Sequence, residues 1–384
     1  MEEKNILYQS DTESKTIFDR TISYLYGKYD LRYNTISLEY EIKYKASEIW
    51  NNLNINSLYI ELVQSGIEIP INKLEILIKS HLIDQYNPIR EYFSKLPKWD
   101  NINHIHELAS HVQTTDDPDF TYHLEKWFTR AVLCALEKGK INKQCLVLAN
   151  SLQNTGKTSF LRYFIPQSLE KYYTENISVD KDGIIAICNN LICNADELAI
   201  LSKSDVNTLK AFISKSNANV RLPYGRKAEY LERICSFVGS TNRTDFLNDE
   251  SGSVRWLVFE VKKINFDYSK NIDIDKVWSQ AFYNAYERKN YNPELTAIDI
   301  VENEKRNEKF KLLSMEQEIL MQHFDHSEDE NKFLTSTDIM IAMNNAIGIK
   351  MSSIKIGKAL MALNFKRIKH SKRQIYGYLI FRRE

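Results

Sequence analysis

The chain has 384 residues, enough for two or three domains, and its 43% hydrophobic and 27% charged residues are typical of a globular protein. Lys and Arg together number 51, as do Asp and Glu, so the net charge of zero does not by itself indicate a polyanionic partner. With only 11 glycines and 7 prolines, the composition argues against long flexible linkers and against a collagen-like or β-sandwich fold.

The sequence shows no sign of a targeting or membrane segment. Its first residues, MEEKNILYQSDTESK, are charged and lack an apolar stretch, so we expect no signal peptide. No apolar run approaches the roughly 18 residues of a membrane helix. The five cysteines are scattered in apolar runs without a C-x-x-C pair, and we therefore expect them to be reduced and buried and the protein to be cytoplasmic. They are Cys134, Cys145, Cys188, Cys193 and Cys235.

Residues 1–100 are expected to form a mainly helical N-terminal region. Apolar residues recur at three- and four-residue spacing in TIFDRTISYLYGKYDLRYN (16–34) and INKLEILIKSHLIDQYN (71–87). Between them, NTISLEYEIKYK (34–45) alternates and predicts a short strand pair. NPIREYFSKLPKW (87–99) marks the boundary. The next segment, DPDFTYHLEKWFTRAVLCALEKGK (117–140), predicts a long helix with Asp119 as its cap.

Residues 101–295 alternate between predicted strands and helices, which favours an α/β fold with a parallel sheet. Buried strands are expected in QCLVLAN, NLICNADEL, CSFVGSTN and SVRWLVFEV, and helices in FLRYFI and DVNTLKAFISKSN. VRLPYGRKAEYLERI (220–234) predicts a hairpin with a basic turn.

Residues 310–384 predict three helices followed by two strands, the order of a winged-helix domain. The helices are KLLSMEQEILMQHF (311–324), TSTDIMIAMNNAIG (335–348) and SSIKIGKALMALN (352–364), the second capped by Thr335 or Ser336. The strands lie in KRIKHSKRQIYGYLIFRR.

The segment SLQNTGKTSF (151–160) matches the end of a phosphate-binding loop, G-x-x-x-x-G-K-[ST]. In such a loop, backbone N–H groups surround the phosphates, a lysine reaches the β- and γ-phosphates and a hydroxyl binds Mg²⁺. Lys157 and Thr158 fill these two roles, and the helix that follows adds its positive end. The alternative is a chance GKT in an ordinary loop. The nucleotide-binding residues we expect are Ser151, Asn154, Thr155, Gly156, Lys157, Thr158 and Ser159.

Two acids, Asp196 and Glu197, end the apolar strand NLICNADEL. Phosphoryl transfer needs a carboxylate to hold Mg²⁺ and a group that orients the attacking water. Asp196 suits the metal, together with Thr158, and Glu197 suits the water. The alternative is that both acids merely begin the next helix.

Two further side chains could complete a catalytic site. Asn242 closes the strand CSFVGSTN, where its amide could hold the attacking water near the γ-phosphate. Arg255 follows a turn in NDESGSVRW, and its guanidinium could neutralise transition-state charge on a neighbouring subunit's nucleotide. The alternatives are a turn-forming asparagine and a surface salt bridge.

Two basic segments suit nucleic acid. In RLPYGRKAEY, charges and a tyrosine flank a Pro-Tyr-Gly turn, which offers phosphate contacts and a stacking ring. Residues 350–384 contain ten Lys and Arg but one acid, and much of that charge lies on the predicted wing. The alternatives are a solvated turn and a protein-docking module. The DNA-binding residues we expect are Arg221, Tyr224, Arg226, Lys227, Lys366, Arg367, Lys369, Lys372 and Arg373.

In chain order, the Lys157 loop, Asp196-Glu197, LKAFISKSNANVRLPYGRKAEYLER, FVGSTN and FLNDESGSVRW resemble the virulence-associated protein E family. The likeness covers about residues 85–260, and the KAFIS to RLPYGR run is its most specific part. The family consists of P-loop ATPases similar to superfamily 3 helicases, found on phages and other mobile elements.

The resemblance implies an AAA+-like ATPase core that forms a ring, expected to be a hexamer, and grips single-stranded DNA with a hairpin in its channel. ATP and Mg²⁺ are the implied cofactors, and duplex DNA is a further partner for the winged helix. Lys157 and Thr158 become Walker A, Asp196 and Glu197 Walker B, Asn242 the sensor and Arg255 the trans finger.

The chain departs from the family pattern at two positions. Ser151 replaces the first glycine of Walker A, and Val254-Arg255-Trp256 stands where paired arginines often precede the aromatic residue. Larger relatives carry a primase domain in front, for which the N-terminal region here is too short.

Three functions compete at this stage. The first is a DNA-dependent ATPase that works as a helicase or replication-initiation motor of a mobile element. The second is an ATP-driven loader or defence-type ATPase that binds DNA without unwinding it. The third is a nucleotide switch that does not hydrolyse, against which Glu197 argues because a switch has no need of a water-activating acid.

Overall fold

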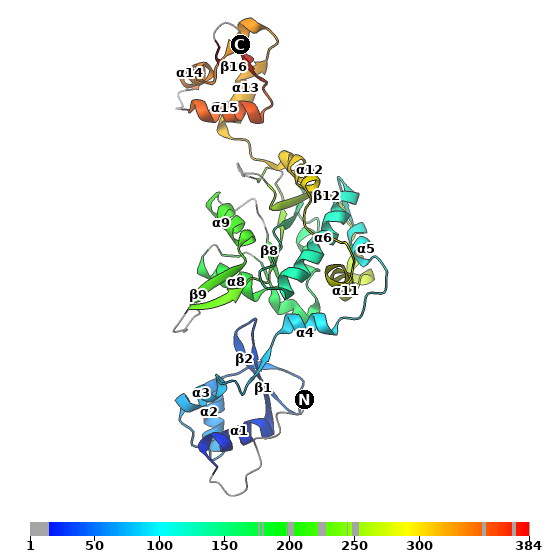
Figure 1. Ribbon diagram of the computed structural model, residues 1–384, viewed down its shortest axis with the longest axis vertical. Coiled ribbons are helices and arrows are strands. Elements are labelled where there is room, and N and C mark those ends of the chain that lie inside the picture. The colour runs from blue at the N-terminus through cyan, green and yellow to red at the C-terminus, as the bar shows by residue number, and fades with distance from the viewer. Residues whose placement is uncertain are drawn as a thin grey trace. The chain divides into compact units, whose positions relative to one another are not determined.

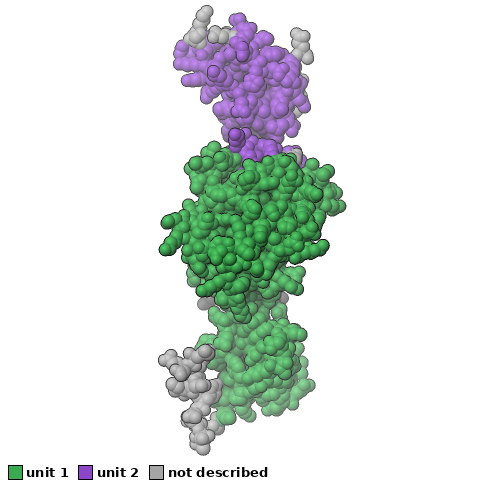
Figure 2. Space-filling model, turned by 90° about the vertical axis from the view of Figure 1, so that its right-hand side faces the viewer, with its two compact units in different colours: residues 1–242, 254–303 green, residues 243–253, 304–384 purple. Residues whose placement is uncertain are grey.

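The computed structural model describes residues 15–175, 177–178, 180–196, 198, 203–221, 228–243, 245–247, 253–347, 351–370 and 374–383. The chain divides into two compact units, shown in Figure 2. Unit 1 comprises residues 1–242 and 254–303, and unit 2 comprises residues 243–253 and 304–384.

The N-terminal part of unit 1 contains three helices, in line with the helical prediction, and a four-stranded sheet that is larger than the predicted strand pair. The helix predicted for residues 16–34 ends at Lys28, and the helix predicted for 71–87 ends at Ile78. After Lys28, the buried residues Tyr29 and Leu31 are two positions apart, which is the spacing of one face of a strand. This segment pairs with residues 39–44 in an antiparallel hairpin. The elements are α1 (Ile17–Lys28), β1 (Tyr29–Asn34), β2 (Glu39–Tyr44), β3 (Asn51–Asn52), α2 (Ile55–Gln64), α3 (Ile71–Ile78) and β4 (Asp84–Tyr86), with sheet order β3-β2-β1-β4.

The rest of unit 1 is built on a six-stranded sheet of order β5-β12-β6-β11-β8-β7. All neighbouring pairs are parallel except β5 with β12, so the predicted parallel α/β sheet is confirmed. Its strands are β5 (Val112–Thr114), β6 (Cys145–Ala149), β7 (Tyr173–Glu175), β8 (Ile192–Ala195), β11 (Ser236–Thr241) and β12 (Trp256–Ile264). A separate hairpin joins β9 (Asn217–Arg221) to β10 (Ala228–Glu232), as predicted.

Helices cover both faces of this sheet, which explains why its central strands are apolar throughout. In Figure 1, α6 and α11 lie on one side of β8, and α8 and α9 on the other. The helices are α4 (Pro88–Lys95), α5 (His104–Ser110), α6 (Asp117–Leu136), α7 (Lys157–Arg162), α8 (Lys181–Asn189), α9 (Lys203–Ser214), α10 (Tyr268–Asn271), α11 (Ile274–Tyr286) and α12 (Ala297–Asn307).

The long helix α6 begins where the sequence predicts, but its cap is Asp116 and not Asp119. The Asp116 carboxylate accepts a hydrogen bond from the backbone N–H of Asp119 at 3.2 Å, which places Asp119 in the first turn. Further along, the indole of Trp127 donates to the carbonyl of Phe237 on β11 at 3.0 Å, so the helix is fixed to the centre of the sheet.

Unit 2 contains the three predicted helices and both predicted C-terminal strands. The helices are α13 (Met315–His323), α14 (Ser336–Ile347) and α15 (Ser353–Ala362), and the strands are β15 (Arg367–Lys369) and β16 (Tyr376–Arg382). Thr335 caps α14, since its hydroxyl accepts from the N–H of Asp338 at 3.1 Å. Two short strands that the sequence did not predict, β13 (Phe324–His326) and β14 (Phe333–Leu334), also pair with β16.

All five cysteines are buried and unpaired, as expected. Within the described part of the chain, no helix combines the length and the apolar character needed to cross a membrane.

A buried arginine holds the base of the β9–β10 hairpin. Arg233 is 1% exposed, and its guanidinium donates to the carbonyls of Phe212 and Cys235 at 3.0 Å each and to that of Asn142 at 2.8 Å. It also donates to the carbonyls of Ile213 and Lys215. The guanidinium therefore satisfies carbonyls at the end of α9 that would otherwise be buried without partners.

We expect Arg233→Ala to cost about 3 kcal/mol of stability, because several buried carbonyls lose a charged donor. Thermal unfolding followed by circular dichroism measures this as a fall of several degrees in the melting temperature. Arg162→Ala is the matched control: Arg162 pairs with Glu175 at 2.7 Å on the surface and should cost less than about 1 kcal/mol. Equal shifts for the two variants would contradict the prediction.

Candidate active site

Three neighbouring parallel strands bring the predicted site residues to one edge of the sheet. β11 lies between β6 and β8, with Thr241 opposite Ala149 and Gly239 opposite Ala195. The segments that leave the carboxyl ends of these strands carry the Lys157 loop, Asn242 and Asp196. In open α/β sheets this edge is where ligands bind.

The loop between β6 and α7 uses left-handed backbone at Asn154 and Gly156, with φ of +56° and +85°. The φ of Gly156 favours glycine, and a Cβ added there would lie 2.6 Å from two carbons at the tip of the exposed Phe266 ring, which would have to move. Ser151 is exposed and is not among the residues with positive φ, so the backbone there does not require the glycine that the loop pattern usually has. Thr155 directly precedes Gly156, and Ser159 lies in the first turn of α7.

Asn150 anchors the start of the loop to the neighbouring strand. Its side-chain nitrogen donates to the carbonyl of Val261 on β12 at 2.5 Å, and its side-chain oxygen accepts from the N–H of Leu152 at 2.6 Å. The sequence did not single out Asn150, because an asparagine after a strand is equally typical of an ordinary turn.

Lys157 is 5% exposed, and its ammonium is surrounded by oxygen atoms. It donates to the side-chain oxygens of Asn242 at 2.8 Å and Thr155 at 3.0 Å, and to the carbonyl of Leu152 at 3.2 Å. The carbonyl of Asn150 lies at 3.5 Å. Burial lowers the pKa of Lys157 below its ordinary value, and the negative charge of Asp196 opposes that shift.

Thr158, Asp196 and Ser240 form a compact oxygen cluster beside this lysine. The Thr158 hydroxyl donates to a carboxylate oxygen of Asp196 at 3.1 Å, and the Ser240 hydroxyl donates to the same oxygen. The two hydroxyl oxygens are 3.2 Å apart. Carboxylate and hydroxyl oxygens are the ligands that a hard divalent cation takes. Ser240 was not predicted as a site residue, although the alternation along β11 could have indicated which of its side chains approach Asp196.

Arg255 lies at the opposite edge of the sheet from Lys157. It directly precedes β12, where Trp256 faces Cys145 at the start of β6, and its carbonyl accepts from the Cys145 N–H at 2.8 Å. The length of β6, roughly 13 Å at 3.3 Å per residue, therefore separates its backbone from the loop edge. Its Nε donates to the hydroxyl of Ser214 at 2.8 Å.

The predicted DNA-binding residues that the structure describes fall into two groups. Arg221 is exposed at the end of β9. Lys366, Arg367 and Lys369 are exposed on or beside β15, where the Arg367 guanidinium lies 4.6 Å from the centre of the Tyr376 ring. Six predicted site residues lie outside the described residues, namely Glu197, Tyr224, Arg226, Lys227, Lys372 and Arg373.

Comparison with known proteins gives one family and one group of similar structures. The model of the virulence-associated protein E-like domain matches residues 93–312. An apo structure of the NrS-1 C-terminal region is 12% identical, with a TM-score of 0.56, and the match covers 96% of this chain and 100% of that one. A second apo form of that region is 11% identical, with a TM-score of 0.53 and the same coverage. At these identities the likeness concerns the fold alone. No curated protein matches the sequence.

The environment of Lys157 predicts a measurable effect of pH on stability. Since its folded-state pKa lies below the unfolded value, the unfolded chain binds more protons between the two values, and stability rises with pH across that range. Without added ligand we therefore expect Lys157→Met to melt at a higher temperature than wild type at pH 7, with the difference shrinking as the pH approaches 10.

Melting temperatures of both proteins between pH 7 and pH 10 test this prediction. Lys79→Met, which alters a lysine whose side chain is 65% exposed, should show no such pH-dependent gain. A Lys157→Met protein that melts below wild type at pH 7 would mean that the oxygen contacts outweigh the cost of burying the charge.

Proposed function

The chain belongs to the virulence-associated protein E-like domain family, and we propose that it is a DNA-dependent ATPase that serves replication of a mobile genetic element. The observation that carries the proposal is the convergence of Lys157, Thr158 and Asp196 at one edge of the parallel sheet. A buried ammonium beside a hydroxyl and a carboxylate provides what polyphosphate and its metal ion need. The sheet and its loop support an AAA+-like P-loop core.

The first role of the site is to bind the phosphates of ATP. Lys157 has three N–H donors, and in this structure they donate hydrogen bonds to oxygen atoms of the protein. On binding, Lys157 would redirect donors to the β- and γ-phosphates, while backbone N–H groups of residues 154–158 surround the chain of phosphates. Burial lowers the pKa of Lys157 in the free protein, and the negative charge of bound phosphates would raise it again.

Thr158 and Asp196 fit a magnesium site. Their oxygens lie 3.1 Å apart, and Mg²⁺ bound there would neutralise charge on the β- and γ-phosphates. Ser240 would keep the Asp196 carboxylate oriented through its hydrogen bond. In this proposal Asn242 orients the attacking water, and Glu197 accepts its proton.

Arg255 is proposed to act on the nucleotide of a neighbouring subunit. Since it lies at the far edge of the sheet from its own Lys157, it does not contribute to the site of its own subunit. In a ring, which we propose to be a hexamer, the edge of one subunit that carries Arg255 would lie against the phosphate-binding loop of the next subunit. This arrangement would make hydrolysis depend on assembly.

DNA is proposed to contact two surfaces. The β9–β10 hairpin would present Arg221 and its tip to single-stranded DNA in the ring channel. Unit 2 would act as a winged helix, with α15 as recognition helix and Lys366, Arg367 and Lys369 on the wing against phosphates. A loader without unwinding activity shares all of these features, so strand displacement on a forked duplex distinguishes the two.

ATP hydrolysis by the purified protein tests the central proposal. We expect turnover that rises with single-stranded DNA and falls to background in Lys157→Ala. Asp196→Asn should lower kcat by about a hundredfold or more, because it weakens the metal site. If wild type binds ATP but neither DNA nor assembly produces turnover, the protein is a nucleotide switch.

Mixing two inactive variants tests the trans role of Arg255. Arg255→Ala alone should lower kcat by about a thousandfold, as loss of an arginine finger does. A mixture of Arg255→Ala and Lys157→Ala subunits should regain activity, because some interfaces combine an intact arginine with an intact lysine. Arg288→Ala, which removes an exposed arginine paired with Glu125, is the control and should keep full activity. No recovery in the mixture would rule out the trans finger.

A further inference from the structure

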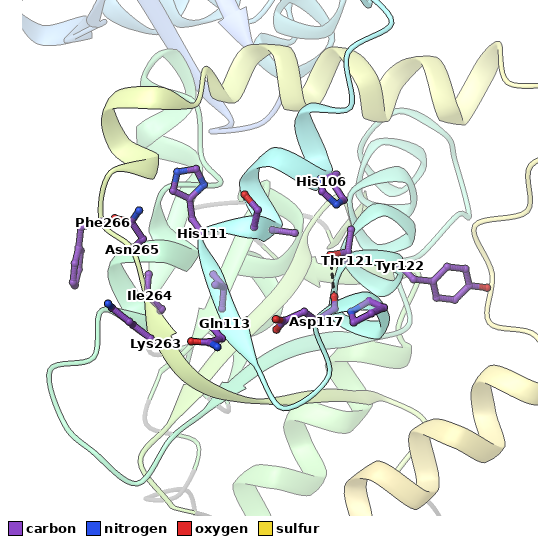
Figure 3. Close-up of a pocket in the computed structure, with 14 residues that line it drawn as sticks. His106, His111, Gln113, Asp117, Thr121, Tyr122, Lys263, Ile264, Asn265 and Phe266 are labelled. Carbon is purple, nitrogen blue, oxygen red and sulfur yellow. Dashed lines mark hydrogen bonds between the residues drawn. The ribbon is translucent and has the colours of Figure 1, made fainter.

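A cavity of about 1190 Å³ lies at the end of β12. The end of β12, the segment from α5 to β5, and the first turns of α6 form its walls (Figure 3). Val112 and Ile264 give it a buried apolar side, and Gln113 and Lys263 face each other across the β5–β12 pair. It thus combines apolar surface with a few polar groups, as pockets for small molecules do.

The cavity adjoins the phosphate-binding loop. Phe266, which lines the cavity, lies so close to Gly156 of the loop that a Cβ there would be 2.6 Å from its ring. Asn150, at the start of the loop, donates to β12 at Val261. Tyr268 packs edge-on against Phe160 of α7, with ring centres 5.2 Å apart. Phe266 itself lines the cavity, while Val261 and Tyr268 lie just before and just after the lining residues 263–266 in the chain.

We propose that this cavity holds the base and ribose of the nucleotide whose phosphates the loop binds. The inference rests on the proposed ATPase function and adds to it the residues that recognise the nucleoside. Because Phe266 both lines the cavity and lies next to Gly156 of the loop, one molecule with a polyanionic end and an aromatic end would fit across the two. A nucleoside triphosphate has that chemistry.

The side chains in the cavity suit a flat heteroaromatic ring. The Phe266 side chain is 54% exposed, and it offers a surface for stacking. His111 donates through Nδ1 to the carbonyl of Glu107 at 2.9 Å, which leaves Nε2 as an acceptor. The Asn265 side-chain oxygen accepts from the N–H of Asp267 at 3.1 Å, which leaves its amide nitrogen as a donor. One acceptor and one donor near a stacking ring match the hydrogen-bonding edge of a base.

Calorimetric titration of the full-length protein with Mg·ATP and with Mg·tripolyphosphate, which lacks the nucleoside, tests the proposal. Wild type should bind ATP more tightly than tripolyphosphate. Phe266→Ala should weaken ATP binding by about tenfold, as loss of one stacked ring does, and leave tripolyphosphate binding unchanged. Phe266→Tyr keeps the ring and should bind ATP as wild type does. Tyr286→Ala is the control, since Tyr286 is a 45% exposed aromatic residue of α11 outside the cavity.

Other binding results would rule out the nucleoside proposal alone or the ATPase function as well. If Phe266→Ala weakens both ligands equally, the ring supports the loop and the nucleoside proposal is wrong. If wild type binds ATP and tripolyphosphate equally well, the cavity takes no part in binding. If wild type binds neither ligand, the proposed ATPase function fails, and the nucleoside proposal fails with it.

Discussion

The parallel pairing of β6, β11 and β8 is the constraint on which the candidate site depends. Because the three strands run in one direction, the segments that follow them all leave from the same edge of the sheet. Lys157, Asn242 and Asp196 come from segments far apart in sequence, yet they meet there around one buried ammonium. Burying a cation is costly unless oxygen atoms surround it. The loop after β6 supplies three of these oxygens, and the segment after β11 adds that of Asn242.

The sequence allowed much of this edge to be predicted, because its signals are local. Short apolar runs predicted the strands β6 and β11, and the GKT motif predicted the phosphate-binding loop. The register could not be predicted, since pairing is a tertiary property. Ser240 therefore went unnoticed, although its hydroxyl contacts both Thr158 and Asp196. For the same reason the helix predicted for residues 16–34 was too long. After Lys28 the chain forms a strand, because it pairs there with β2.

The cavity beside the loop had no signal in the sequence at all. Its walls come from residues 106–122 and 263–266, and neither segment carries a recognisable motif. Only the antiparallel addition of β5 to β12 brings them together, and this is the one pair in the sheet that departs from the parallel pattern. A site assembled in this way becomes visible from the fold and not from the spacing of residues.

The hydrogen bond between Lys157 and Asn242 has a consequence for communication along the chain. Asn242 is the last residue of unit 1 before the chain enters unit 2 at Arg243. The lysine has three donors but four oxygens within reach, so any anion that takes a donor must displace a protein oxygen. Asn242 is one of these oxygens, so the residue that competes with an anion for the lysine also directly precedes the covalent connection between the two units.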